Sequence, residues 1–460
     1  MDTTPGSAAW WLAHLLKKLA HQRTHAKKLE EYLDGCNGIP TTADKAVQQS
    51  YRRLMSMART NFAELVVEAV RERMAPAGFR TGAGGDENGD AEAWRIWQAN
   101  SLDADSALVH RASLGLANGY VIVGPVDPET NAPVITPESP FEVVTAHDPV
   151  RKRKTVAALK VYRDDVANVD RAYLYLPGAV YRLGRPVAAE TETLATDAAA
   201  WQFVDAQVLP EQVVPVVRFA NRAKLDGTAV GEFEPHLAIL DRINFTILSR
   251  LEIATLQAFR QRALKGGPTH DEAGNEINYD DIFASDPGAL WHLPAGADLW
   301  ESGVVDLGPI RSAVRDDVQD LAAVTRTPLF YLTPDSANGS AEGASLAREG
   351  LVFKTTDRLV QAGESWERVM ALAFLFAGDH ERAQLPDLEV MWTSPERFSL
   401  AERYDAASKA QGAGVPWREV MADVLQFSPQ VIDRMESERS ADILQAFALG
   451  PQPVTPPNGA

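Results

Sequence analysis

Residues 321–378 read LAAVTRTPLFYLTPDSANGSAEGASLAREGLVFKTTDRLVQAGESWERVMALAFLFAG, which is a helix end, a polar loop and a long helix. Pro328 and Pro334 end the first helix, because proline lacks the amide proton and clashes with the preceding turn. The polar residues 335–340 predict a loop. The pattern is helical again from Ala341, and the helix is expected to end at Gly378. A polar loop between two helices can be a functional device, and its role depends on the rest of the chain.

The composition is that of an ordinary globular protein with more than one domain. The chain has 460 residues, of which 45% are hydrophobic and 23% charged, and at this length about two to four domains are expected. Its formal net charge is −18 and its sequence pI is about 5.0. Proteins that grip nucleic acid through its phosphates are usually basic or carry a dense basic patch. Any contact of this chain with DNA is therefore expected to be loose.

The single cysteine, Cys36, excludes an intrachain disulfide and a cysteine-based metal site. A reducing compartment is the simplest inference from it. No stretch approaches the roughly 18 apolar residues of a membrane span. The N-terminal apolar run has an acidic residue before it and Lys17 and Lys18 after it, which is the reverse of a signal peptide's polarity.

The periodicity of apolar residues predicts an α+β protein. Helical spacing is followed by short β-branched and aromatic runs, which indicate an antiparallel β region, and then by helical spacing again. The expected helices cover 8–33, 43–75, a stretch that contains Trp94 and Trp97 and ends near 116, 232–264, 309–325, 341–377 and a module over 399–448. The expected strands cover 120–123, 141–145, 155–162, 172–176, 180–183, 213–219 and 388–392. A small turn-rich insertion over 267–303 lies between two of the helices.

Candidate sites for catalysis or ligands are weak. The glycine-rich loop 82–89 has no Walker lysine, and the acidic run 270–281 lacks the spacing and closing glutamate of a calcium loop, so surface loops are expected at both. His110 and Cys36 lack the partners that a nucleophilic site needs, and a hydrogen-bonded structural role is expected for His110. The basic run 151–154 fits a solvated hairpin turn or a contact with an anionic partner. No catalytic residue, cofactor or metal ligand is predicted.

Several stretches in a fixed order resemble the portal (head–tail connector) proteins of tailed double-stranded DNA bacteriophages, especially those of actinobacteria. The resemblance covers about residues 25–445. Besides 321–378, the stretches that carry it are YLDGCNGIP from Tyr32, WQANSLDADSALVHRASLGLANGYVIVGP from Trp97, VVPVVRFANR from Val213, GEFEPHLAILDRIN from Gly231 and SPERFSLAERYDAASKAQGAGVPWREVMADVLQFSPQVIDRME from Ser394.

The resemblance implies the portal fold, an α+β fold with a mixed α/β wing, a two-helix stem, a small inserted clip, a tunnel loop, a long helix and a helical crown. The implied divisions are a wing over 1–230, stem helix 1 over 231–266, the clip over 267–303, stem helix 2 over 304–327, the tunnel loop over 328–343, the long wing helix and a strand over 344–398, the crown over 399–448 and a disordered tail over 449–460.

The resemblance also implies roles for individual residues. DNA-facing residues of the tunnel loop would be Thr333, Asp335, Ser336, Asn338, Gly339 and Ser340. Arg348 and Lys354 would contact phosphates. Clip residues that contact terminase or an adaptor would be Asp271, Tyr279, Asp281 and Trp291. Stem-packing residues would be Leu237, Leu240, Asn244, Ile247 and Leu251, on helix faces that pack against neighbouring subunits.

A protein of this kind is expected to form a dodecameric ring at one capsid vertex, made in the host cytoplasm and built into the virion. The ring would give weak, sequence-independent passage to double-stranded DNA during packaging and ejection. Its expected partners are further copies of itself, the terminase large subunit, a head-completion or adaptor protein, and the major capsid and scaffolding proteins. No membrane is expected among them. Two alternatives remain at this point: a non-viral scaffold or interaction protein that forms no ring, and a hydrolase with a site near His110 or Cys36.

Overall fold

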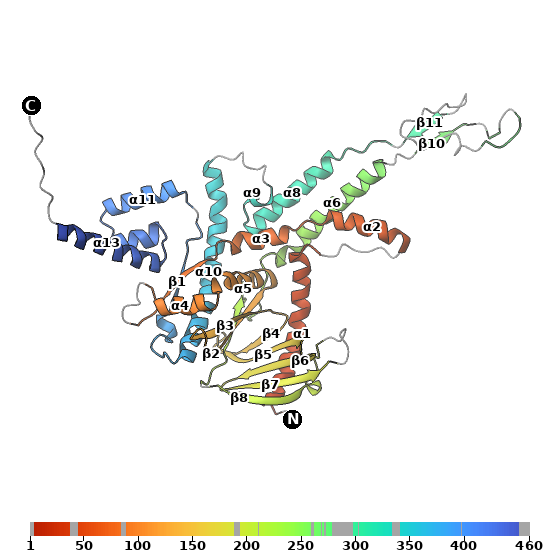
Figure 1. The fold of residues 1–460 in the computed structure, drawn as a ribbon. Helices are drawn as coiled ribbons and strands as arrows, with labels where there is room; N and C mark the ends of the chain where they lie inside the picture. The colour runs from red at the N-terminus through yellow and green to blue at the C-terminus, as the bar shows by residue number, and fades with distance from the viewer. Residues whose placement is uncertain are drawn as a thin grey trace, which may run out of the picture. The chain divides into compact units, whose positions relative to one another are not determined.

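The computed structural model describes residues 4–36, 45–83, 89–187, 194–209, 211–258, 262–267, 269–270, 273–277, 298–301, 303–333, 341–396 and 398–449. The chain forms two compact units, each built from segments that are far apart in sequence (Figure 1). Unit 1 consists of Met1–Asn37, Asn61–Leu237 and Leu321–Ala460, and unit 2 of Gly38–Thr60 and Ala238–Asp320.

The largest sheet of unit 1 has five antiparallel strands in the order β4-β5-β6-β7-β8. Its strands are β4 (Val143–His147), β5 (Thr155–Asp164), β6 (Val169–Leu176), β7 (Ala179–Pro186) and β8 (Gln202–Val208). Successive side chains of a strand point to opposite faces, so each strand supplies both faces of the sheet. Val144 and Ala146 belong to the core on one face, whereas Val143 belongs to the core on the other.

The helix α1 (Ala8–Leu33) covers one face of this sheet (Figure 1). It begins after Ser7, whose side chain accepts a hydrogen bond from the Trp10 amide, as N-cap residues do. Its buried leucines recur at helical spacing and pack against β4, β5, β6 and β7: Leu12, Leu15, Leu16 and Leu19. Burying a leucine side chain contributes roughly 1.5–3 kcal/mol. This apolar stripe therefore fixes α1 on the sheet.

A second sheet of unit 1 has the order β3-β2-β9 and packs against the other face of the first sheet. Its strands are β2 (Asn118–Asp127), β3 (Ala132–Glu138) and β9 (Val216–Ala220), all antiparallel. Tyr120, Ile122 and Val216 pack there against Val143 and Ala158 of the larger sheet. The antiparallel β region predicted from the sequence is confirmed.

Helices and one short strand pair complete this core. The elements are α3 (Phe62–Arg71), α4 (Ala91–Ala99), α5 (Leu102–Leu116), α10 (Ala341–Ala377), and β1 (Pro76–Arg80) paired antiparallel with β12 (Glu389–Trp392). The fully buried Trp366 of α10 lies with its ring centroid 4.9 Å from that of Trp97 and 4.8 Å from that of Phe219. Segments that are more than a hundred residues apart therefore meet at Trp366.

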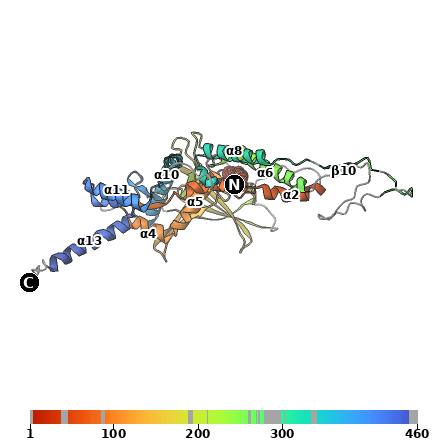
Figure 2. The same cartoon turned by 90° about the horizontal axis from the view of Figure 1, so that it is seen from above.

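The C-terminal helices of unit 1 form a small core of their own. They are α11 (Leu400–Gly412), α12 (Trp417–Glu419), a π-helical turn over Val420–Val424, and α13 (Pro429–Leu449). Ala407, Val420, Met421 and Ile432 are buried together, and α11 and α13 both contact the π-helical turn (Figures 1 and 2).

Unit 2 contains the helices α2 (Lys45–Ala58), α6 (Leu237–Ala258) and most of α8 (Gly308–Thr325), with β10 (Arg262–Lys265) paired antiparallel to β11 (Asp298–Glu301). Arg242 of α6 contacts Asp317 of α8 at 2.8 Å. Asn244 Oδ1 accepts hydrogen bonds from the Thr60 amide at 3.0 Å and from its hydroxyl at 2.7 Å. These contacts join the segments of unit 2.

The structure corrects several of the predicted elements. The helix predicted over 43–75 is two helices, because the Asn61 side chain caps a new helix that begins at Phe62 by accepting from the Glu64 amide. The helix predicted to run to 264 ends at Ala258, and residues 262–265 form β10 instead. The strands β1, β3, β8 and β11 were not predicted. The helix limits predicted at 8–33 and 341–377 are confirmed.

Candidate functional site

The segment around the predicted tunnel loop is formed by the end of α8, the short helix α9 (Leu329–Leu332) and α10. Thr333 ends α9, where its amide donates to the Leu329 carbonyl at 2.8 Å. The other five predicted loop residues lie outside the described part of the chain: Asp335, Ser336, Asn338, Gly339 and Ser340. The described chain on either side of residues 334–340 consists of α9 and α10.

A buried ion cluster, the Glu232 cluster, lies beneath the first half of α10. It consists of Glu232, Lys354, Arg358 and Asn221. One carboxylate oxygen of Glu232 accepts from Arg358 Nε at 2.5 Å and from Asn221 Nδ2 at 3.0 Å. The other lies 3.2 Å from Lys354 Nζ. Only 2% of the Glu232 side chain is exposed, so its charge depends on these partners.

Lys354 also holds the end of α8. Its ammonium donates to the Thr325 carbonyl at 2.9 Å, at the C-terminus of that helix. A cation is favourable there, because the last carbonyls of a helix lack partners and carry partial negative charge. The first half of α10 and the end of α8, on the two sides of residues 334–340, are thereby joined through Lys354 to one carboxylate.

This geometry corrects the expected phosphate contact at Lys354. The residue is 6% exposed, and Glu232 and the Thr325 carbonyl occupy its ammonium. Arg348, one and a half turns earlier on α10, is exposed and remains a candidate for a phosphate contact. Sequence reasoning missed Glu232 and Arg358 as partners, because the carboxylate is more than a hundred residues away from the two cations that it pairs with.

The electrostatics of the cluster keep Glu232 ionised. Burial by itself raises the pKa of this carboxyl, but Lys354, Arg358 and the hydrogen bonds from Arg358 and Asn221 outweigh it and lower the pKa to about 2. The result at neutral pH is a buried carboxylate between two cations. Removing any charged member of such a cluster leaves an uncompensated buried charge.

The short helix α9 has its own anchor. The Tyr331 hydroxyl accepts a hydrogen bond from Arg73 at 2.9 Å, and the Arg73 guanidinium lies 5.9 Å from the centroid of the Tyr331 ring. Arg73 follows α3, so α9 is tied to a helix of the unit 1 core. The contact holds the chain immediately before residues 334–340.

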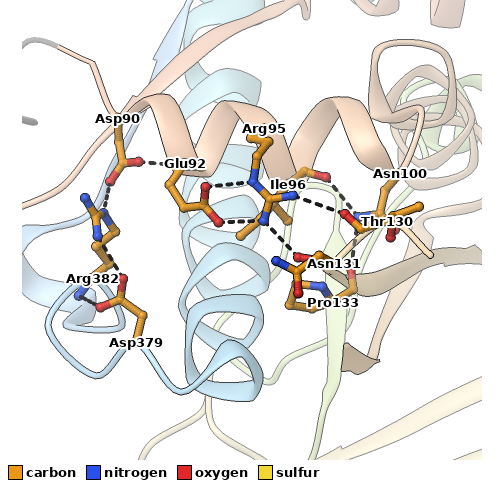
Figure 3. Close-up of polar contacts among 11 residues, drawn as sticks. Asp90, Glu92, Arg95, Ile96, Asn100, Thr130, Asn131, Pro133, Asp379 and Arg382 are labelled. Atoms are coloured by element: carbon orange, nitrogen blue, oxygen red, sulfur yellow. Dashed lines mark hydrogen bonds and ion pairs between the residues drawn. The ribbon is translucent and has the colours of Figure 1, made fainter. Parts of the chain in front are cut away.

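The far end of α10 is held by a second set of charges (Figure 3). Arg382, just after α10, contacts Asp90 at 2.9 Å and Asp379 at 2.8 Å. Asp90 also caps α4 by accepting from the Ala93 amide at 2.8 Å. With 37 residues, α10 is about 55 Å long, and it is held at Lys354 and Arg358, at Trp366 and just beyond its C-terminus.

The structure confirms a structural role for His110. Its Nε2 accepts a hydrogen bond from Trp366 Nε1 at 2.9 Å, and burial lowers the pKa of the imidazole to about 3. Cys36 is exposed, and its thiol donates to the Asp34 carbonyl at 3.6 Å. Among the described residues, no group of three histidine, cysteine or acidic side chains is arranged to hold a metal ion. None of the described helices is both long and apolar enough to cross a membrane.

The basic run 151–154 forms the turn between β4 and β5, which was one of its two expected roles. Asp148 Oδ1 accepts from the amides of Val150 at 2.7 Å and Arg151 at 2.8 Å and closes the turn. Arg153 forms an ion pair with Glu364 of α10 at 2.9 Å.

The residues expected to pack the stem against neighbours are mostly used within the chain. Leu240, Asn244 and Ile247 are buried, and Leu237 and Leu251 are half-buried. Among the described side chains of α6, the large apolar one that is exposed is Phe245, at 60%. The expected clip residues lie outside the described part of the chain: Asp271, Tyr279, Asp281 and Trp291.

Comparison with known proteins supports the resemblance seen in the sequence. The chain is 27% identical over 411 residues to the portal protein of Mycobacterium phage D29, which covers 86% of this chain and 81% of that protein. It is 26% identical over 414 residues to the portal protein of Mycobacterium phage L5, with the same coverage. A chain in the neck of a native GTA particle, computed with C12 symmetry, is 12% identical with a TM-score of 0.45, covering 86% of this chain and 98% of that chain.

The family whose sequence profile matches is described as "Phage portal protein, SPP1 Gp6-like", and the match covers residues 12–444. This span includes both sheets, the Glu232 cluster and α10. The chain therefore belongs to the SPP1 Gp6-like family of phage portal proteins.

Proposed function

We propose that this portal-family chain assembles as a dodecameric ring at one capsid vertex and that double-stranded DNA passes through the channel of the ring during packaging and ejection. The family match over residues 12–444 is the observation that carries this proposal. The named relatives are portal proteins of mycobacteriophages, which agrees with an actinobacteriophage source.

Residues 328–343 are proposed to form the constriction of the channel. The geometry on both sides supports this assignment, because α8, α9 and α10 are each held by polar contacts of buried or half-buried side chains: Thr325 by Lys354, and Tyr331 by Arg73. A segment placed between fixed helices can meet DNA without disturbing the core. The force of DNA on the segment would pass through Lys354 to the Glu232 cluster.

The charge of the chain supports passage rather than tight binding. At −18 per chain, a ring repels DNA phosphates, so DNA would slide through the channel and not adhere to it. Arg348 is the described cation proposed to touch phosphates transiently. Each chain of a ring would present one such residue, and the contacts would be weak and independent of DNA sequence.

Each division of the chain is proposed to contact its own partner proteins. The clip, residues 267–303, would dock the terminase large subunit and later a head-completion or adaptor protein. The wing and crown would face the major capsid and scaffolding proteins within the head. The chain would be made in the host cytoplasm and be retained in the virion.

A complementation assay in a phage that lacks its portal gene tests the channel assignment. Shortening residues 336–340 should abolish DNA packaging or retention while rings still form, because the anchors of the flanking helices remain. A matched control shortens the exposed turn 165–168 between β5 and β6, which should leave packaging unchanged. Normal packaging by the 336–340 variant would show that the tunnel assignment is wrong.

A further inference from the structure

A cleft of about 820 Å³ opens in unit 1 beside the second half of α10 and the edge strand β9. Its volume falls within the range of ligand-binding pockets, roughly 300–1,000 Å³. Much of its wall is apolar and comes from the two sheets and α10: Val156, Pro177, Val214, Val217, Leu372 and Leu375. None of the described residues within 328–343 lines the cleft, so a ligand in it is separate from the channel function proposed above.

Positive charge is concentrated around the same cleft. Six lysine and arginine side chains line it, and no aspartate or glutamate is among the described residues that do so. Glu364, which is not among the lining residues, pairs with two of the six at 2.9 Å each, so an excess of positive charge persists. The six cations are Lys152, Arg153, Lys154, Arg218, Lys224 and Arg368. In a chain with a formal charge of −18, such a surface calls for an explanation.

The partners seen for some of these cations are neutral. Arg218 donates to Asn118 Oδ1 at 2.7 Å and to the Gly227 carbonyl at 3.2 Å, and Lys152 donates to the Leu225 carbonyl. Lys154 and Lys224 are exposed at the mouth. Carbonyl and amide oxygens orient these cations without cancelling their charge.

His147 is a further lining residue of the cleft. Its Nε2 bonds the Thr145 hydroxyl at 2.9 Å, but its Nδ1 is buried and has no hydrogen-bond partner among the described residues. Burial lowers the pKa of this imidazole to about 4, and the charges of Arg218, Lys18 and Arg368 add to that effect. With its pKa lowered to about 4, this imidazole is neutral at pH 7 and adds no charge to that of the six cations.

We propose that this cleft binds an acidic, apolar peptide segment of a partner protein. Its carboxylates would pair with the cations at the mouth, and its apolar side chains would pack against the wall beside Leu372 and Leu375. A DNA backbone would satisfy the cations but leave the apolar wall in contact with water. The charge and the apolarity of the site together favour the peptide.

Binding of fluorescent model peptides to the purified full chain tests the chemistry. The probe is a 12-residue peptide that alternates leucine and glutamate, and two comparison peptides replace either glutamate with lysine or leucine with serine. Saturable binding of the leucine–glutamate peptide alone is expected in fluorescence anisotropy. Failure of that peptide to bind, or equal binding of the lysine peptide, overturns the proposal.

Charge reversal locates the site. The double variant Lys154→Glu/Lys224→Glu should weaken binding of the leucine–glutamate peptide by about tenfold or more, because it reverses two cations at the mouth. The matched control, Lys27→Glu/Lys28→Glu, makes the same change on the exposed side of α1 and should leave binding unchanged. If both double variants weaken peptide binding equally, the peptide does not bind in this cleft.

Comparison of assembly states identifies the occupant. Separated chains and assembled rings should bind the leucine–glutamate peptide with similar affinity if a partner protein fills the cleft. Binding by separated chains that is lost in rings means that a second copy covers the cleft, and this overturns the partner assignment. Ring formation itself is read separately by microscopy, so failure of this proposal leaves the channel function standing.

Discussion

Glu232 is the buried carboxylate that pairs with both Lys354 and Arg358. Among the described residues, the other carboxylate in contact with either cation is the exposed Asp357, beside Arg358. Replacing Glu232 by glutamine keeps the shape but leaves two cations buried with a neutral partner. The Glu232→Gln variant is expected to lose about 3–5 kcal/mol of unfolding free energy. Urea denaturation, followed by the tryptophan fluorescence of unit 1, measures this loss. The control Asp405→Asn breaks an exposed pair with Lys409 and should cost less than about 1 kcal/mol. Equal losses would contradict the cluster's role.

The same residue predicts a pH dependence. The pKa of Glu232 is lowered in the folded chain from its ordinary 4.5 to about 2, so the ionised carboxylate stabilises the fold. That contribution is fully present above about pH 4.5 and is lost as the pH falls toward 2. The stability difference between the wild type and Glu232→Gln should therefore shrink over this window. A difference that stays constant from pH 6 to pH 3 would show that another group governs the acid response.

Lys354 shows where sequence reasoning fails at this scale. Mixed charges at helical spacing on α10 could not indicate which cation is buried, because that depends on Glu232 and Thr325 elsewhere in the chain. The role of His110 was predicted correctly, since an isolated histidine in an apolar helix is most simply a hydrogen-bonded core residue. Residue roles set by long-range contacts need the fold.

At the scale of elements, the strongest local signals gave the most accurate predictions. The limits of α1 and α10 follow from apolar spacing with capping residues or glycine at the ends. In contrast, β3 contains Pro133 and Pro137, which argue against a strand in sequence, and β8 is an exposed edge strand without a buried face. Their strand state depends on pairing with β2 and β7.

The start of α11 carries a testable capping box. The Ser399 hydroxyl accepts from the Glu402 amide at 3.2 Å, and the Glu402 side chain accepts from the Ser399 amide at 2.8 Å. Ser399→Ala should destabilise the C-terminal helices by about 1 kcal/mol, seen as faster hydrogen exchange in α11. Ser408→Ala, in the exposed interior of the same helix, should be neutral or slightly stabilising. Faster exchange in both variants would contradict the cap.

At the scale of the whole molecule, the proposed clip can be removed without touching unit 1. Replacing residues 267–297 by a short glycine–serine linker should abolish terminase docking while leaving the Glu232 cluster and the sheets intact. A pull-down with the terminase large subunit measures the loss, and circular dichroism checks that the remaining elements fold. Undiminished docking would show that terminase contacts another part of the chain.

The family assignment and the charge of the chain were both visible in the sequence, because the stretches that carry the resemblance are distributed over most of its length. The cleft beside α10 was not predicted, since its wall combines residues from β5, β9 and α10 that only the fold brings together. At this scale the sequence identified the protein family, whereas the cleft beside α10 could be found only in the folded structure.

Negative-stain electron microscopy of the purified full chain would show whether it closes into a ring. Ring assembly predicts particles with a central channel, since a portal-family chain is proposed to act only as a closed ring. A chain that stays monomeric under every assembly condition, including in the presence of its scaffolding protein, would contradict it.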